Sequence, residues 1–534
     1  MVKLSPPLAF FPLALVLASC ATVAPPSPAE RAEIWWKDVS TLAADDMEGR
    51  QTGSRGHRRA ADYVIARVKA IGLEPAVSDG FLQPVAFEEQ YVDAADSSAF
   101  LVTGGKSEPL AIPGDMIVGR GGGPRPDRIE APLVFVGYGL HIPEAGHDDF
   151  AGLDLTGKIA VVIGGGPPEI AGPLKSHARR DRSRMLSERG AAGVLSLTTP
   201  KATEVPWARA ALQASQPGMY FADPAIRDVK DGFFEAAINP ERAEKLFAGS
   251  GHSFAGIAAL ADASKPLPRV ELKPSLRASL APRFRRVDSF NVVARLPGSD
   301  PKLKAEHVLF SAHLDHLGIG QPIAGDGLYN GAMDNAAGVA GLLDIATRYM
   351  QHRQRPKRSM LFVFVTAEEK GLLGSRYFAL RPSVPKSSIL ADFNFDMALP
   401  IFPLKSVIVL GAEESSLGAD ASAVGQSMGL PIVPDPFPDR NSFVRSDQYS
   451  FIREGIPSLA FKFGFAAKTP EAEIERVWRS TRYHAPSDDL AQPVERLDAV
   501  RLHDFVAALA LRVANAPERP RWLPQSFFRR FAEE

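Results

Sequence analysis

The sequence predicts an α/β fold, in which a mainly parallel sheet is sandwiched by helices and a β-rich domain is inserted. The first observation is that short apolar segments alternate with amphipathic segments of helical spacing from residue 290 onward. This alternation is typical of parallel strands joined by helices. The second is that residues 110–280 contain short apolar runs separated by glycine- and proline-rich turns. Such a pattern favours a separate β-rich unit.

The first twenty residues have the pattern of a secretory signal. A basic start precedes an apolar run, Leu8 to Ala18, that is too short to span a bilayer. Residues 17–20 resemble the bacterial lipoprotein box, so we expect lipidation of Cys20, loss of residues 1–19 and a tether over residues 21–30. Ala21 then suggests anchoring to the outer membrane, facing the periplasm. The alternative is an ordinary signal with a coincidental cysteine.

Composition limits the function classes. The 534 residues suggest roughly three domain-sized units. The net charge of -1 argues against a nucleic-acid partner, because phosphate binding needs a basic surface. Cys20 is the only cysteine, so the fold must form without an internal disulfide.

The elements follow in order. Residues 31–109 form the first part of the main domain, and residues 31–75 are expected to be helical, closed by Gly72. The insert covers 110–280; its Gly164–Gly166 run lacks the spacing of a dinucleotide site. The main domain resumes over residues 281–515. Its expected strands are 307–312, 360–366, 389–395, 406–410 and 457–461, and its expected helices are 336–350, 372–380 and 497–515.

A basic, aromatic tail covers residues 516–534. It could pack on the body of the protein or contact lipid headgroups. A loosely packed terminus is the alternative.

Six acidic and imidazole side chains stand where expected strands end or helices begin. They are His313, Asp334, Glu368, Glu369, Asp396 and His484. Such a set can bind two metal ions and leave one carboxylate as a base.

The first two motifs each leave an alternative open. His313 ends a buried strand, and residues two apart on an extended chain point the same way. We therefore expect the Asp315 carboxylate to orient the His313 imidazole, with His316 facing away; a surface pair is the alternative. Asp334 precedes a helix, where it could be a simple N-cap or could bridge two cations.

Glu368 and Glu369 give the sharpest signal. A fully apolar strand delivers both carboxylates at its C-terminal end, where open α/β sheets place their sites. Adjacent buried carboxylates need a cation, so one could bind a metal while the other takes a proton from water. A solvated loop pair is the alternative. Asp396 ends the next strand, and Asp488 could support His484 from four residues away.

Together, these motifs resemble the co-catalytic zinc aminopeptidases, the family that includes glutamate carboxypeptidase II and the transferrin receptor. The matching elements are His313-x-Asp315, Gly331-Ala-x-Asp334-Asn, Ala367-Glu-Glu, Asp396 and Tyr483-His-x-x-x-Asp488. Residues 43–54 and 289–298 are similar to other stretches of that family, and residues 110–280 look like its protease-associated domain. The resemblance implies the zinc aminopeptidase fold.

The resemblance also implies two zinc ions, with His313 and Asp396 on one, Glu369 and His484 on the other, and Asp334 between them. Glu368 becomes the general base, and Tyr483 or Ser446 holds the oxyanion. A cis peptide bond between Asp334 and Asn335 is implied as well.

We therefore expect a metalloaminopeptidase that removes N-terminal residues from peptides, with acids near the metals holding the α-amine. Phe461, Phe463 and Phe465 alternate and could line an apolar side-chain pocket, although core packing is expected for at least one. A carboxypeptidase or dipeptidase is the alternative, disfavoured because residues 455–463 offer only Lys462 and no arginine. A non-catalytic receptor-like protein is disfavoured because every metal ligand is present.

Overall fold

The computed structural model describes residues 1–2, 25–119, 122–203, 206–214, 216–351, 355–440 and 442–532. Cys20, predicted to be lipidated, lies outside these residues, and so does most of the predicted signal and tether. No helix among the described residues is both long enough and apolar enough to cross a membrane.

A ten-stranded sheet forms the main domain. Its order is β11 (Gly218–Phe221), β2 (Leu82–Val92), β14 (Pro282–Leu296), β18 (Ser359–Val365), β15 (His307–His313), β19 (Ile389–Asn394), β22 (Ser458–Phe463), β20 (Val407–Leu410) and β21 (Ile432–Val433), with β1 (Glu74–Pro75) beside β14. The central strands β18, β15, β19 and β22 are parallel. Antiparallel pairs flank them, β14 with β18 and β20 with β22. The expected α/β class is confirmed, and the sheet is mixed toward its edges.

Helices cover both faces of this sheet. Alternate residues of a strand point to opposite faces, so Phe362 and Phe364 of β18 face one layer while Val363 and Val365 face the other. The first layer contains α1 (Pro28–Leu42), α2 (Arg55–Ile71), α6 (Ala337–Gln351) and α11 (Arg496–Asn515), and the second contains α7 (Leu373–Leu380) and α9 (Gln448–Ile452). The helices α8 (Leu417–Met428) and α10 (Pro470–Thr481) complete the domain.

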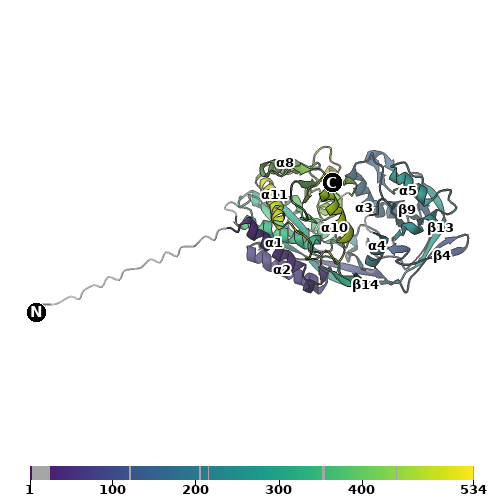
Figure 1. The fold of residues 1–534 in the computed structure, drawn as a ribbon, viewed down its shortest axis with the longest axis horizontal. Helices are drawn as coiled ribbons and strands as arrows, with labels where there is room; N and C mark the ends of the chain where they lie inside the picture. The colour runs from purple at the N-terminus through teal and green to yellow at the C-terminus, as the bar shows by residue number, and fades with distance from the viewer. Residues whose placement is uncertain are drawn as a thin grey trace.

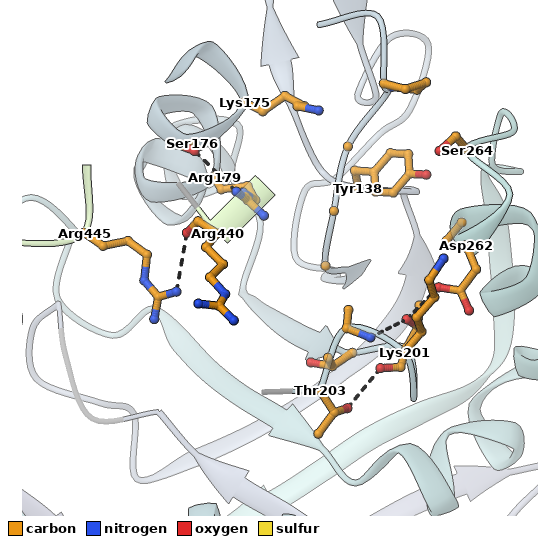
Figure 2. Close-up of a pocket in the computed structure, with 18 of the residues that line it drawn as sticks. Tyr138, Lys175, Ser176, Arg179, Lys201, Thr203, Asp262, Ser264, Arg440 and Arg445 are labelled. Atoms are coloured by element: carbon orange, nitrogen blue, oxygen red, sulfur yellow. Dashed lines mark hydrogen bonds between the residues drawn. The ribbon is translucent and has the colours of Figure 1, made fainter. Parts of the chain in front are cut away.

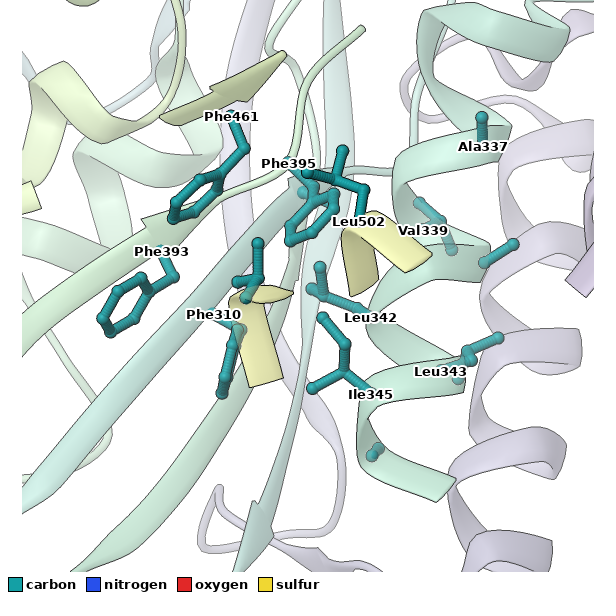
Figure 3. Packing of buried hydrophobic residues seen from close by; sticks show 14 of the residues in the cluster. Phe310, Ala337, Val339, Leu342, Leu343, Ile345, Phe393, Phe395, Phe461 and Leu502 are labelled. Carbon is teal, nitrogen blue, oxygen red and sulfur yellow. The ribbon is translucent and has the colours of Figure 1, made fainter. Parts of the chain in front are cut away.

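Aromatic side chains fill the space under α6. Phe310 stacks on Phe362 with ring centroids 5.0 Å apart, and Phe393 stacks on Phe461 at 6.0 Å. Figure 3 shows Phe310, Phe393 and Phe461 on the strand side of this layer and Leu342 on α6. Each such burial stabilises the fold by about 2–3 kcal/mol. The layer therefore holds the strands, and the side chains at their ends, in fixed positions.

The expected helical segment at 31–75 is two helices. A short 3-10 turn, Asp45–Arg50, separates α1 from α2. Ser54 caps α2 by accepting a hydrogen bond from the His57 amide at 3.1 Å, and Gly72 ends it with a φ of 94°. The apolar periodicity that predicted a helix lies at residues 60–71, inside α2, so it did not reveal the turn before it.

A second, eight-stranded sheet forms the inserted module. Its order is β4 (Lys106–Leu110), β3 (Ser98–Thr103), β13 (Val270–Ser279), β6 (Arg128–Phe135), β9 (Ile159–Ile163), β10 (Gly193–Leu197), β12 (Phe234–Ile238) and β5 (Met116–Val118). The helices α3 (Gly172–Glu188), α4 (Trp207–Gln213) and α5 (Phe254–Asp262) belong to the same segment. Short hairpins are β7 (His141–Ile142) with β8 (His147–Asp148), and β16 (Gly318–Ile323) with β17 (Asp326–Tyr329). In Figure 1 the module, with α3, α5, β9 and β13, lies beside the main domain, with α1, α8 and α11.

The module differs from the expected 110–280 segment in two ways. Its sheet begins at Ser98, ahead of the expected boundary. The strand β11, inside the expected insert, instead pairs with β2 of the main sheet. This pairing covers the free edge of β2 and ties the module to the main domain. The assignment of the module to the protease-associated class stays a prediction.

The tail packs on the body of the protein. Phe528 is completely buried, the Trp522 indole donates to the carbonyl of Gly455 at 2.9 Å, and Ser526 donates to Glu414 at 2.6 Å. The tail's last turn, Phe527–Ala532, also reaches the module, where Arg530 pairs with Glu144. The sequence left open whether the tail packs on the body of the protein or contacts lipid headgroups. The described residues of the tail pack on the body of the protein.

Candidate metal centre

The predicted site residues meet at one edge of the main sheet. His313 ends β15, Glu368 and Glu369 follow β18, and Asp396 follows β19. These three strands are parallel neighbours, so their C-terminal ends lie at the same edge, where α/β proteins place their sites. Asp334 lies just before α6 and His484 just after α10. The buried layer described above therefore fixes the strand ends that carry the ligand atoms.

The first group of ligand atoms surrounds His313. Its Nε2 lies 3.2 Å from Asp334 Oδ1 and 3.4 Å from Asp396 Oδ1. His313 Nδ1 lies 3.0 Å from the carbonyl of Asp315, to which it can only donate. His313 Nε2 then presents a lone pair to carboxylate oxygens. Within the described residues, His313 Nε2 and Asp396 Oδ1 are buried without a hydrogen-bond partner, an arrangement that calls for a cation.

The second group surrounds Glu369. His484 Nε2 lies 3.2 Å from Glu369 Oε2 and 3.4 Å from Asp334 Oδ2. His316 Nδ1 lies 2.8 Å from the other oxygen, Glu369 Oε1. His316 also falls within reach of a common ion with Asp334 and Glu369. We take His484 as the ligand, because its distances match those of the first group, while 2.8 Å is an ordinary hydrogen bond.

These separations fit zinc. A tetrahedral ion with ligand distances of about 2.0–2.1 Å separates its ligand atoms by about 3.3 Å, and the measured values run from 3.2 to 3.4 Å. Asp334 uses one oxygen for each group, as a bridging carboxylate does. Imidazole nitrogen and carboxylate oxygen are suitable donors for zinc. The expected cis bond between Asp334 and Asn335 is confirmed.

Two supporting acids act differently from the prediction. The Asp315 carboxylate does not lie behind His313; it accepts from the amides of Glu368 (3.1 Å) and Glu369 (3.4 Å). Asp488 does not support His484; it accepts from the amide of Asp334 at 3.0 Å and from that of Met333. Both carboxylates fix the backbone that carries ligands. Spacing along one strand could not show this, because the contacts join distant segments.

Two residues of the site were missed. His316, expected to face away, is fully buried and contacts Glu369. Arg50 is 1% exposed and donates to the carbonyls of Leu314 (3.0 Å) and Asn330 (2.7 Å), behind the metal ligands. The one sequence signal was that Arg50 lies within the stretch that resembles the family.

The pKa values of the two adjacent glutamates are shifted in opposite directions. Burial raises the pKa of Glu368 well above its ordinary value. The nearby His313 lowers this pKa, whereas Glu369 and Asp396 raise it. Burial also acts to raise the pKa of Glu369. The neighbouring His484 acts in the opposite direction, and the pKa of Glu369 lies below its ordinary value. Two carboxylates with separated pKa values suit an acid–base group and a ligand.

A pocket opens on the metal groups, where Tyr483 and Ser446 lie with Glu368. The Tyr483 ring stacks on His484 at 3.9 Å, and burial, with Asp334 and Glu369 nearby, raises the pKa of Tyr483. Its phenol therefore keeps its proton and can donate. Asn394 donates to Ser446 Oγ at 3.0 Å, which leaves the Ser446 hydroxyl hydrogen for an acceptor in the pocket.

The expected apolar pocket is only partly formed by the three phenylalanines. Phe461 is fully buried against Phe393 and Phe395 in the core. Phe463 and Phe465 line a recess beyond the pocket. The pocket wall itself carries Arg440, Arg445, Lys462 and Arg479. Three of these cations come from outside residues 455–463, where the sequence offered no arginine.

Comparisons with known proteins agree with this geometry. A leucine aminopeptidase 2, described as probable, from Aspergillus oryzae is 30% identical over 218 residues, which are 38% of this chain and 40% of the relative. Leupeptin-inactivating enzyme 1 of Streptomyces exfoliatus is 31% identical over 38% of this chain and 43% of its own length. Carboxypeptidase Q of Rattus norvegicus is 34% identical over 22% and 24%. The matches thus span less than half of these relatives.

The fold is shared over a longer range. The structure of an aminopeptidase from Aneurinibacillus sp. strain AM-1 covers 91% of this chain and 95% of its own, with a TM-score of 0.52 and 19% identity. Residues 291–510 match the family described as Peptidase family M28. That segment contains all five of the predicted metal ligands, and over these residues the chain is similar to peptidase family M28.

Proposed function

We propose that the protein is a zinc-dependent exopeptidase, and specifically an aminopeptidase with two zinc ions. The observation that carries the proposal is the pair of ligand groups that share Asp334, with the half-buried carboxylate of Glu368 beside them. The names of the relatives, a leucine aminopeptidase and a carboxypeptidase, support an exopeptidase.

The ligands would be His313 and Asp396 for one ion, Glu369 and His484 for the other, and Asp334 for both. Bound zinc would supply Lewis-acid chemistry: it lowers the pKa of water and polarises a carbonyl. Glu368 takes a proton from the attacking water and passes it to the leaving amine. Tyr483 or Ser446 donates a hydrogen bond to the oxygen that gains charge.

Several residues of the chain keep this arrangement rigid. Asp315 holds the amides of both glutamates, and Asp488 holds that of Asp334. His316 holds the Glu369 oxygen that faces away from His484. A site fixed in this way needs little reorganisation during the reaction.

A carboxypeptidase or dipeptidase is the second candidate. Arg440, Lys462 and Arg479 on the pocket wall favour it, because cations recognise a terminal carboxylate. One peptide in three forms separates the two candidates: free, N-acetylated and C-amidated.

For an aminopeptidase, acetylation removes the charged α-amine and should lower kcat/KM on the order of 10³-fold, while amidation changes little. If the acetylated form is cleaved as fast as the free peptide, or if only the amidated form resists, the aminopeptidase proposal fails and the second candidate replaces it.

A further inference from the structure

A second and larger cavity opens beside the metal centre, between the inserted module and the main domain. Its volume is about 780 Å³. Tyr138, Lys175 and Lys201 line it from the module, and Arg440 and Arg445 line it from the main domain (Figure 2). Neither the metal ligands nor Glu368 contribute to this cavity.

The wall of this cavity is strongly positive. Among the described residues that line it, the cations are Lys175, Arg179, Arg180, Lys201, Arg440 and Arg445, and Asp262 is the only carboxylate. Asp262 accepts a hydrogen bond from Thr199 at 2.9 Å. Lys175 is 8% exposed. In the part of the chain that the structure describes, Lys175 and Lys201 form no salt bridge.

Arg440 joins this cavity to the catalytic pocket. It lines the large cavity, the pocket on the metal groups and the recess that contains Phe463. Arg440 Nη1 lies 2.7 Å from Glu475, and Arg479 pairs with that same Glu475 oxygen. Two guanidinium groups therefore share one carboxylate.

Lys462 adds a third cation at the same place. Among the described residues, its Nζ contacts the backbone carbonyls of Met397 (3.3 Å) and Asp396 (3.5 Å). The protein thus holds an excess of positive charge between the metal ligands and the cavity, where a bound anion would reduce the repulsion.

We infer that the substrate is an acidic peptide, with one carboxylate near the scissile bond bound by Arg440 and Lys462. Further acidic residues lie in the large cavity against Lys175 and Lys201. Arginine binds carboxylates through paired hydrogen bonds, and a concave positive wall concentrates anions. This inference rests on the proposed exopeptidase function, and it differs from the expectation of an apolar side-chain pocket.

Four peptides test the inference on the zinc-loaded protein. The first is a neutral tetrapeptide amide; the second and third carry glutamate at the first or second position; the fourth is the neutral peptide with a free C-terminal carboxylate. At least one carboxylate-bearing peptide should show a kcat/KM at least ~10-fold above that of the neutral amide. The ratio of its kcat/KM to that of the neutral amide should decrease as the NaCl concentration increases.

The peptide whose kcat/KM exceeds that of the neutral amide identifies the source of the carboxylate. A gain by the second or third peptide assigns it to a side chain, and a gain by the fourth alone assigns it to the chain terminus. Equal rates for all four would overturn the inference while the exopeptidase proposal stands. Cleavage of none of them would overturn both.

Substitutions of the cations test which side chains cause the preference for carboxylate-bearing peptides. Arg440→Gln should remove most of the preference, on the order of 10-fold in kcat/KM for the carboxylate-bearing peptide relative to the neutral amide. Arg286→Gln is the matched control, because Arg286 is exposed on β14 and pairs with Asp288. The double variant Lys175→Gln/Lys201→Gln keeps the Glu475 contacts and should weaken the salt dependence. An unchanged preference in Arg440→Gln and in the double variant would overturn the inference.

Discussion

At the residue scale, neighbours in the sequence have different tasks at the metal centre. Glu368 and Glu369 follow the same strand, and their amides contact the same Asp315 carboxylate. Glu369 Oε2 lies 3.2 Å from His484, whereas Glu368 lines the open pocket. This geometry supports the proposed roles of Glu369 as a metal ligand and Glu368 as a base.

Glu368→Gln should lower kcat by at least ~10², because the amide cannot accept the proton of water. It should leave metal content unchanged, since Glu368 is not assigned as a ligand. Glu369→Gln should instead lower the zinc content. Metal analysis with steady-state kinetics checks both variants. Loss of zinc in Glu368→Gln, with retention in Glu369→Gln, would show that the two roles are reversed.

The convergence of the candidate ligands on one place could be predicted from the sequence, but their supports could not. Each ligand follows an apolar strand or flanks a helix, and periodicity reveals those positions. The supports depend on contacts between distant segments: Asp488 meets the amide of Asp334, and Arg50 meets the carbonyl of Leu314. No local pattern encodes such contacts. The same limit hid Arg440, which meets Glu475 only in the folded chain.

A buried histidine away from the metal centre predicts sensitivity to acid. His307 is 4% exposed, and burial, with Arg295 nearby, lowers the pKa of His307 to about 4. The unfolded chain binds a proton near pH 6.5. Between pH 6.5 and 4 the unfolded state thus holds more protons, so the free energy of unfolding falls as pH falls.

His307→Gln should reduce this loss by about 2 kcal/mol between pH 6.5 and 4.5. Urea unfolding at several pH values measures it. The control is His252→Gln, since His252 is exposed; it should keep the steep dependence. If His307→Gln loses as much stability as the unaltered protein, His307 does not contribute to the acid sensitivity.

At the element scale, the tail acts as part of the core. Phe528 contacts the rings of Trp522, Phe527 and Phe443, at 5.9, 5.3 and 5.5 Å. The segment that carries it lies beyond α11, where the sequence offered no helical or strand periodicity. Its aromatic residues pack against β20 and α9 and fill a second hydrophobic cluster.

Phe528→Ala should destabilise the protein by about 3–5 kcal/mol, because it leaves a cavity in this cluster. Phe284→Ala is the matched control: Phe284 is 51% exposed on β14, and its loss should change stability by about 0.5 kcal/mol or less. Equal effects in urea unfolding would mean that the tail does not pack as described.

The strands and helices that position the site were predictable. β15, β18 and β19 lie within a residue or two of the expected ranges, because each is a short apolar run followed by polar residues. The antiparallel flanks and β11 were not predictable, since pairing partners are set by topology. The module's early start was missed in part because β4, the strand after β3, carries polar residues at exposed positions.

At the scale of the whole molecule, the prediction that concerns where the protein works is the lipidation of Cys20. We propose that Cys20 is acylated and holds the protein at the outer membrane, facing the periplasm, through the lipoprotein box of residues 17–20. Mass spectrometry of the protein from its native membrane should show an acylated Cys20 as the first residue. An unmodified N-terminus beyond residue 20 would contradict the anchor.

The central claim is that two zinc ions in the Asp334 centre cause peptide hydrolysis. The most direct measurement removes metal with a chelator and returns zinc in steps while following hydrolysis of an aminoacyl anilide. Activity should disappear in the metal-free protein and return fully at two zinc ions per chain, since Asp334 joins two ligand groups. Full activity in the metal-free protein, or no recovery with zinc in a chain that remains folded, would contradict the claim.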